Sequence, residues 1–237
     1  MTSRGGGGRS FDWGRGRMSS YGYCERADPS FWAEPLNAWS NGAFLLAALA
    51  GLMLLWRAGR ADWPAAIMTA LVFAIAIGSF LFHTMPQRWT LLADVVPIQL
   101  FAFFYFGLAL RRFFGASAAG AILGTLFFLA ASSALAALLA LWLPPVLRGS
   151  TGYAGFVIAL FGVAAVLALR GQAGTTACQI GLAGLVFALS LTLRSLDGVL
   201  CQHVPLGLHW AWHLLNAAVL YLLLRAAITY RSPSRSI

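Results

Sequence analysis

The sequence predicts an all-α integral membrane protein, a bundle of seven transmembrane helices. Three observations lead to this fold class. Of the 237 residues, 60% are hydrophobic and only 10% are charged, whereas soluble domains carry about 25% charged residues. The apolar residues gather into seven windows, close to the roughly 20 residues that a spanning helix needs. No window alternates apolar and polar residues as a strand would.

The seven windows divide the chain in a simple order. The expected helices are 37–56, 64–83, 91–110, 118–143, 152–169, 177–193 and 206–224. Prolines 144 and 145 close the fourth window, because proline breaks a helix. We expect 1–22 to be a disordered or weakly ordered tail, 23–230 to be one transmembrane domain, and 231–237 to be a C-terminal tail.

The positive charges predict an orientation and exclude one class of partner. All 16 basic residues are arginine, and the net charge is +9. In a soluble protein this charge would suggest nucleic acid, but here the arginines lie between apolar runs, so we expect no nucleic-acid partner. Cytoplasmic loops are enriched in Arg. The loops and the C-terminal end on one side hold eight (57, 60, 111, 112, 170, 225, 231, 235), the loops on the other side hold three (88, 148, 194), and the N-terminal tail holds five more, four of them far from the first helix.

We therefore expect the C-terminus in the cytoplasm and the N-terminus outside. Next to the first helix the N-terminal tail is acidic, which agrees with this orientation. The use of arginine without lysine, with many alanines and leucines, is typical of GC-rich prokaryotic genomes. The expected location is accordingly a prokaryotic inner (plasma) membrane.

Four ionisable residues fall within or at the ends of apolar windows, where they are costly and indicate function. His83 ends the second window, Asp94 begins the third, and His209 and His213 begin the seventh. Because successive helices alternate in direction, all four lie on the N-terminal side of the membrane. His203 lies in the preceding loop and is interpreted as a solvated histidine.

The histidine spacing predicts a metal site. His209 and His213 are four residues apart and share a helix face. With His83 from another helix they supply three imidazoles, the ligand set typical of catalytic zinc with an open position. Zinc lowers the pKa of bound water to about 7. Asp94 suits a general base, and Ser79, one turn before His83, suits a hydrogen-bond donor to the water or to an oxyanion.

An acidic cluster precedes the first window. Glu25, Asp28 and Glu34 lie within ten residues, and carboxylates on a short polar segment suit calcium. A solvated acidic collar or a cap on the first helix explains them as well. From the residues alone we favour the second interpretation.

Four segments resemble the alkaline ceramidase family, within the superfamily that includes the adiponectin receptors. They are YCERADPSFWAEPLNAWSN (23–41), GSFLFHT (78–84), ADVVPI (93–98) and SLDGVLCQHVPLGLHWAWHLLNA (195–217). The specific feature is their combination: SxxxH, an Asp eleven residues after that histidine, and HxxxH. The segments between them match only as apolar spans.

The resemblance implies a zinc hydrolase that cleaves the amide bond of ceramide, a membrane lipid, into a sphingoid base and a fatty acid. It assigns zinc to His83, His209 and His213, and catalysis to Ser79 and Asp94. It also implies a calcium site that includes Glu25 and Glu34, with Asp28 as an additional ligand. The Asp that the family usually has shortly before its Cys-Glu pair is replaced here, where Tyr21 and Gly22 stand.

Cys24 and Cys201 both fall on the side of the predicted site. A disulfide between them is expected if that side is oxidising, and two free thiols are the alternative.

Other functions remain open at this point. They are a receptor or scaffold with a structural zinc, a hydrolase of another lipid amide or ester, a haem protein and a proton-coupled transporter. Ser79 and Asp94 disfavour a structural site, which needs no water-activating pair. Haem ligands usually face each other from different helices, and transporter sites lie near the midplane.

Overall fold

The computed structural model describes residues 23–171 and 174–230. Within these ranges the chain is helical without strands, and seven helices are long and apolar enough to cross a membrane. The predicted fold class is confirmed. The two expected tails, 1–22 and 231–237, lie outside the described residues, together with Tyr21, Gly22 and six of the arginines counted above.

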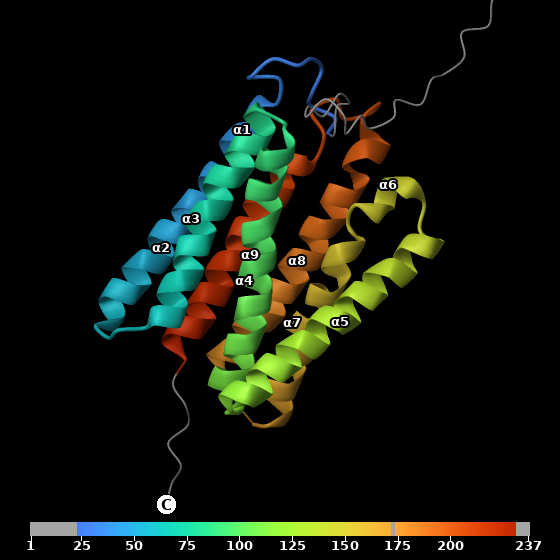
Figure 1. Ribbon diagram of the computed structural model, residues 1–237. Helices are drawn as coiled ribbons and strands as arrows, with labels where there is room; N and C mark the ends of the chain where they lie inside the picture. The colour runs from blue at the N-terminus through green and yellow to red at the C-terminus, as the bar shows by residue number, and fades with distance from the viewer. Residues whose placement is uncertain (1–22, 172–173, 231–237) are drawn as a thin grey trace, which may run out of the picture.

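Each expected window corresponds to one span. The first consists of α1 (Pro35–Ser40) and α2 (Gly42–Ala58). The others are α3 (Trp63–Thr84), α4 (Arg88–Phe114), α5 (Ala118–Trp142), η2 with α7 (Thr151–Tyr153 and Ala154–Leu169), α8 (Thr175–Leu200) and α9 (His209–Thr229). A short helix, α6 (Pro145–Arg148), follows α5. Successive spans run in opposite directions (Figure 1).

Two of the helix boundaries that differ from the expected ones lie near the predicted site. The sixth window was expected to end at residue 193, but α8 continues to Leu200 and holds Arg194 and Asp197 inside the helix. The seventh was expected to begin at 206, but α9 begins at His209. Gly207, at φ +67°, marks the turn before it, a conformation that favours glycine.

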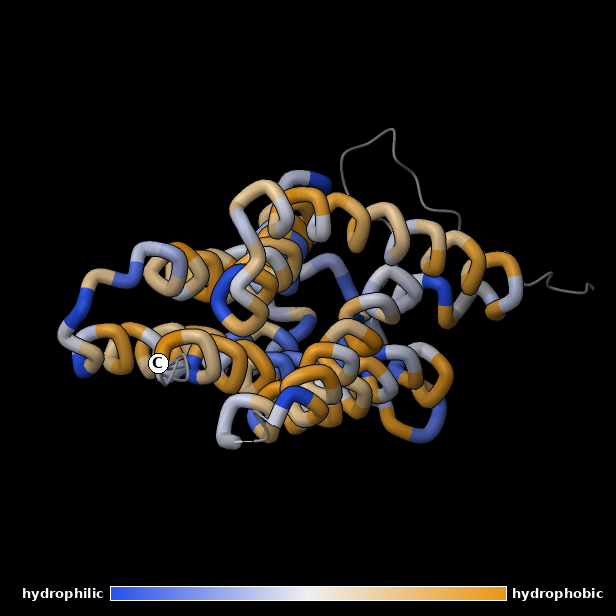
Figure 2. The backbone as a smooth tube through the Cα atoms, turned by 90° about the horizontal axis from the view of Figure 1, so that it is seen from below, coloured by the Kyte–Doolittle hydropathy of each residue, from blue (hydrophilic) through white to orange (hydrophobic). Residues whose placement is uncertain are grey.

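Helix α9 is the centre of the bundle. It packs against α2 and α8 along its length and also contacts α3 and α4. Its inner face is buried, with Leu224, Ala226 and Ala227 fully enclosed. In Figure 2 the hydrophobic colours follow the helices, and hydrophilic residues gather mainly in the connections at their ends. Lipid therefore replaces water around a protein core built on the last helix.

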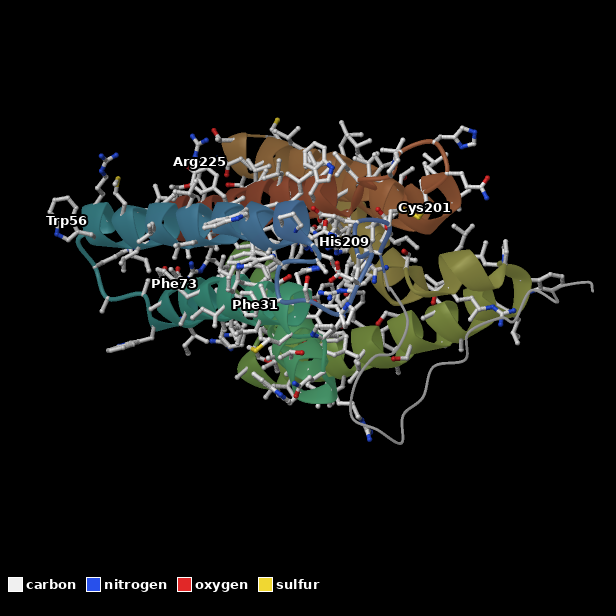
Figure 3. All side chains as sticks on the ribbon, turned by 90° about the horizontal axis from the view of Figure 1, so that it is seen from above. Phe31, Trp56, Phe73, Cys201, His209 and Arg225 are labelled. Atoms are coloured by element: carbon white, nitrogen blue, oxygen red, sulfur yellow. A yellow bond between two sulfur atoms is a disulfide. The ribbon has the colours of Figure 1, made fainter. Side chains whose placement is uncertain are left out.

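Exposed tryptophans mark the two ends of the bundle. Trp56 and Trp63 flank the connection between α2 and α3, and Figure 3 shows Trp56 at the far end of α2 from His209. Trp39, Trp89 and Trp142 are exposed near the opposite helix ends. Such aromatic belts sit at membrane–water interfaces, so the two belts bracket the hydrocarbon region.

A polar contact closes the end of the bundle that carries Trp56. Asp62 caps α3 by accepting the Ala65 N–H at 3.2 Å. The Arg112 guanidinium donates to the Asp62 carboxylate at 2.8 Å and to the Ala227 carbonyl at 2.6 Å. Arg112, near the end of α4, thereby connects the start of α3 with the end of α9.

Candidate metal centre

Three buried histidines meet at the other end of the bundle. His83 comes from the last turn of α3, and His209 and His213 come from the first two turns of α9. One nitrogen of each lies within 4.8 Å of the others. Two zinc–nitrogen bonds of about 2.0–2.1 Å at a tetrahedral angle hold their nitrogens roughly 3.3–3.4 Å apart, so modest side-chain adjustments would place all three on one ion. In the described part of the chain no other three His, Cys, Asp or Glu residues are grouped this way.

Two of the imidazoles are held through their Nδ1 atoms. His83 Nδ1 lies 2.5 Å from Glu34 Oε2, and His213 Nδ1 lies 2.7 Å from the Ser40 hydroxyl. Metal-binding histidines commonly use the second ring nitrogen in this way, which fixes the ring orientation. These bonds leave the Nε2 atoms for a ligand.

Unpartnered nitrogens point to a metal. Among the described side chains, His83 Nε2 and His209 Nδ1 are buried atoms without a hydrogen-bond partner. Buried polar atoms are rarely left unsatisfied in proteins. A set of three imidazoles with buried free nitrogens fits a divalent ion such as zinc. The predicted ligands are therefore brought together in a form that suits the predicted group.

Asp197 positions His209 and was missed by the sequence analysis. Its Oδ1 accepts the N–H groups of Leu208 at 2.6 Å and His209 at 3.0 Å, and its Oδ2 accepts the N–H of Cys24 at 3.1 Å. A Cβ at Gly207 would collide with the Asp197 carboxylate. The available signal was a buried Asp in an apolar helix, which by itself indicates a function.

The N-terminal segment covers the histidines. The Tyr23 ring stacks on the His209 ring with centroids 3.6 Å apart, and burial raises the pKa of its phenol well above the usual range. A disulfide joins Cys24 to Cys201 at the end of α8. Figure 3 shows Cys201 and His209 toward the same end of the molecule. The covalent link keeps Tyr23 over the candidate metal centre.

Ser79 and Asp94 lie beside His83, on two adjacent helices. Ser79 is buried one turn before His83, and its side chain lies close to the carboxylate of Asp94 on α4. Helices α3 and α4 approach closely here. The measure of this approach is that a Cβ added to Gly78 would collide with the Ala93 carbonyl. The glycine thus permits the approach that joins Ser79 to Asp94.

Gly78→Ala is expected to destabilise the protein and to lower its activity, because its methyl group meets rigid backbone. Overpacking of this kind costs about 1–3 kcal/mol. Thermal unfolding in detergent would measure it, since about 1 kcal/mol shifts the midpoint by roughly 2–4 °C in a protein of this size. Gly162→Ala on α7 is the matched control, because nothing lies within 4 Å of its added Cβ. Equal midpoints for the two variants would contradict the close approach.

The three N-terminal carboxylates occupy separate positions. Glu25 accepts the N–H groups of Leu36 and Asn37 at 2.6 and 2.8 Å, and so caps α1. Asp28 is exposed, and its hydrogen bonds with Ser30 lower its pKa. Glu34 is buried; burial alone would raise its pKa, but bonding and charge from His83 and Arg26 outweigh it, so the pKa is lowered. The predicted calcium ligands are not brought together in a single group.

Arg194 was expected in a loop, but it lies inside α8. Its Nη1 donates to the Gly149 carbonyl and the Ser150 hydroxyl, both at 2.9 Å. Its guanidinium lies 5.5 Å from the Tyr153 ring centroid and 5.4 Å from that of Trp212, within the range of cation–π contacts. These partners explain how a cation can remain inside α8.

A protein-family comparison agrees with this geometry. The family model described as Ceramidase matches residues 17–236, nearly the whole chain. The chain belongs to the ceramidase family. The match includes all four segments on which the sequence resemblance rests. Among curated proteins, none matches the chain.

Ceramidase family membership indicates a ceramide-hydrolysing function, and hence a hydrolase that acts on an amide. The apolar spans agree with a lipid substrate in a membrane. The three buried histidines are consistent with a metal-dependent hydrolase within this family.

Proposed function

We propose that this ceramidase is a zinc-dependent intramembrane hydrolase that cleaves the amide bond of ceramide into a sphingoid base and a fatty acid. The observation that carries the proposal is the group formed by His83, His209 and His213, with buried nitrogens that lack partners. Three imidazoles leave a fourth position open, as in catalytic rather than structural zinc sites. Ser79 and Asp94 beside His83 supply the polar groups that hydrolysis requires.

An apolar cavity next to the histidines suits the hydrocarbon part of the substrate. Trp212 and Asn216, on either side of His213 in α9, line it together with later residues of α9 and with residues of α2, α3, α4, α5, α7, α8 and η2. Its walls are almost entirely aliphatic and aromatic, including Phe101, Phe156 and Phe187. An acyl chain lying there would place its amide near the polar end of the bundle.

The side chains divide the chemistry between them. When bound, zinc would supply Lewis-acid activation of a water molecule and of the amide carbonyl. Asp94 is assigned the proton transfer. It accepts a proton from the attacking water and returns it to the amide nitrogen as the C–N bond breaks. Ser79 donates a hydrogen bond toward the carbonyl oxygen as negative charge develops there. Glu34 and Ser40 keep two imidazoles oriented throughout.

The proposed orientation has the metal centre facing outward and the C-terminus in the cytoplasm. The Cys24–Cys201 disulfide lies at the metal-centre end, and disulfides persist on oxidising sides of membranes. The opposite end carries six of the ten described arginines, in or next to the last turns of helices, at 57, 60, 111, 112, 170 and 225. In a prokaryotic inner membrane this arrangement would open the site toward the outer leaflet.

A product assay tests the proposed function. Purified protein loaded with zinc would be incubated with ceramides, other N-acyl lipids and lipid esters, and products would be measured by mass spectrometry. We expect release of sphingoid base and fatty acid from ceramide, loss of that release after zinc removal, and its return after zinc is added back. Hydrolysis of only another amide or an ester would contradict the substrate, and no hydrolysis at all would favour a receptor or scaffold.

A further inference from the structure

Arg26 occupies a cage of oxygen atoms between the N-terminal segment and α3. It is 6% exposed. Its Nε donates to Glu34 Oε1, its Nη2 donates to the His83 carbonyl at 2.6 Å, and its Nη1 faces the carbonyls of Asp28 and Ser30, each at 3.4 Å. One carboxylate and three backbone carbonyls therefore surround the guanidinium. Carboxylates and carbonyls are also the ligands that calcium prefers.

The carboxylates that the family resemblance assigns to calcium are already engaged. Both oxygens of Glu25 accept backbone N–H groups at the start of α1. The oxygens of Glu34 accept Arg26 on one side, and the amide of Asn37 and the His83 ring on the other. The described carboxylates do not converge on a common point. The residues present thus fit a guanidinium better than a calcium ion.

We propose that Arg26 is the fixed cation of the N-terminal segment, taking the place of a bound calcium ion, and that it positions His83 through Glu34. Glu34 lies between the guanidinium and His83 Nδ1, so the three side chains form one chain of charge-assisted hydrogen bonds. Arg26 also holds the backbone carbonyl of His83 itself. The positioning of His83 rests on the proposed metal centre, whereas independence from calcium does not.

The first experiment measures calcium directly. Wild-type protein, with its disulfide intact, would be purified in calcium-depleted buffer and heated with calcium chloride, magnesium chloride or neither. A calcium ion present at a hundred times its Kd would raise the unfolding midpoint by roughly 5–10 °C. We expect the calcium and magnesium midpoints to agree, and elemental analysis to find no stoichiometric calcium. A calcium-specific rise, or one calcium per chain, would overturn the proposal whatever the substrate is.

The second experiment tests the positioning of His83. Arg26→Gln removes the charge, and Arg57→Gln removes an exposed arginine at the far end of the bundle as the matched control. Loss of an outer-shell partner weakens metal binding by about 10–100-fold, and we expect a zinc affinity loss of that size for Arg26→Gln alone. Unchanged zinc affinity in Arg26→Gln would overturn the positioning role, even if its midpoint fell. If that variant does not fold, Arg26→Lys replaces it, because lysine keeps the charge but lacks the forked guanidinium that contacts Glu34 and the His83 carbonyl together. Unchanged zinc affinity in Arg26→Lys would likewise overturn the positioning role.

Discussion

His213→Ala is expected to abolish bound zinc and ceramide hydrolysis while the seven-helix bundle still inserts. His213 supplies one of three imidazoles that meet within 4.8 Å, and its Nδ1 is fixed by Ser40. Two imidazoles from different helices cannot replace a three-ligand site, so the loss should exceed the roughly 100-fold that removal of an outer-shell partner can cause. Zinc per chain by elemental analysis and product release by mass spectrometry would measure the two effects.

His203→Ala is the matched control for this substitution. His203 lies exposed in the connection between α8 and α9 and is not one of the three grouped histidines. We expect it to keep one zinc per chain and wild-type turnover. Membrane insertion of both variants should be unchanged, because seven apolar spans rather than the histidines drive it. A His213→Ala protein with full zinc and full activity would remove this residue from the centre.

The fold was predictable because lipid imposes a simple rule on the sequence. Every backbone group in a spanning segment must be paired within its helix, so hydropathy alone locates the spans. The same rule made the histidines informative, because alternating helix directions place His83 and His209 on one side. Spacing of four residues then places His213 on the same helix face. These inferences depend only on the local sequence and on counting the spans, because each span reverses the direction of the one before it.

What the sequence analysis missed depends on partners that are distant along the chain. The sixth span was expected to stop at residue 193, just before Arg194. The helix continues because Arg194 finds Ser150 and two aromatic rings, and because Asp197 binds the N–H groups that begin α9. No local pattern reveals such pairs. Arg194 and Ser150 lie 44 residues apart, and Asp197 lies 11 and 12 residues from the two residues whose N–H groups it binds.

Glu34 shows the same limit within the candidate site. The family resemblance grouped it with Glu25 and Asp28 around a calcium ion, whereas its contacts in space include Arg26 and His83. The histidine lies 49 residues away along the chain. The chemistry of a carboxylate could be predicted from the sequence, but its partner could not.

Asp94→Asn is expected to retain zinc and lose most turnover. Asparagine has nearly the same shape as aspartate, so the packing of α3 against α4 should persist. The amide cannot accept and return a proton, and general acid–base catalysis contributes about 10²–10⁴-fold. We expect kcat to fall by that factor with zinc per chain unchanged, measured on the same preparations.

Asp62→Asn is the matched control for Asp94→Asn. It shows how much activity is lost when a carboxylate that takes no part in proton transfer is replaced by an amide. Asp62 caps α3 and pairs with Arg112 at the opposite end of the bundle from the histidines, so its amide variant should be less stable but turn over normally per folded molecule. Full activity in Asp94→Asn would take the carboxylate out of the reaction. Loss of zinc from Asp94→Asn would instead show that Asp94 helps to bind the ion. A carboxylate that only transfers a proton would not change the amount of bound zinc.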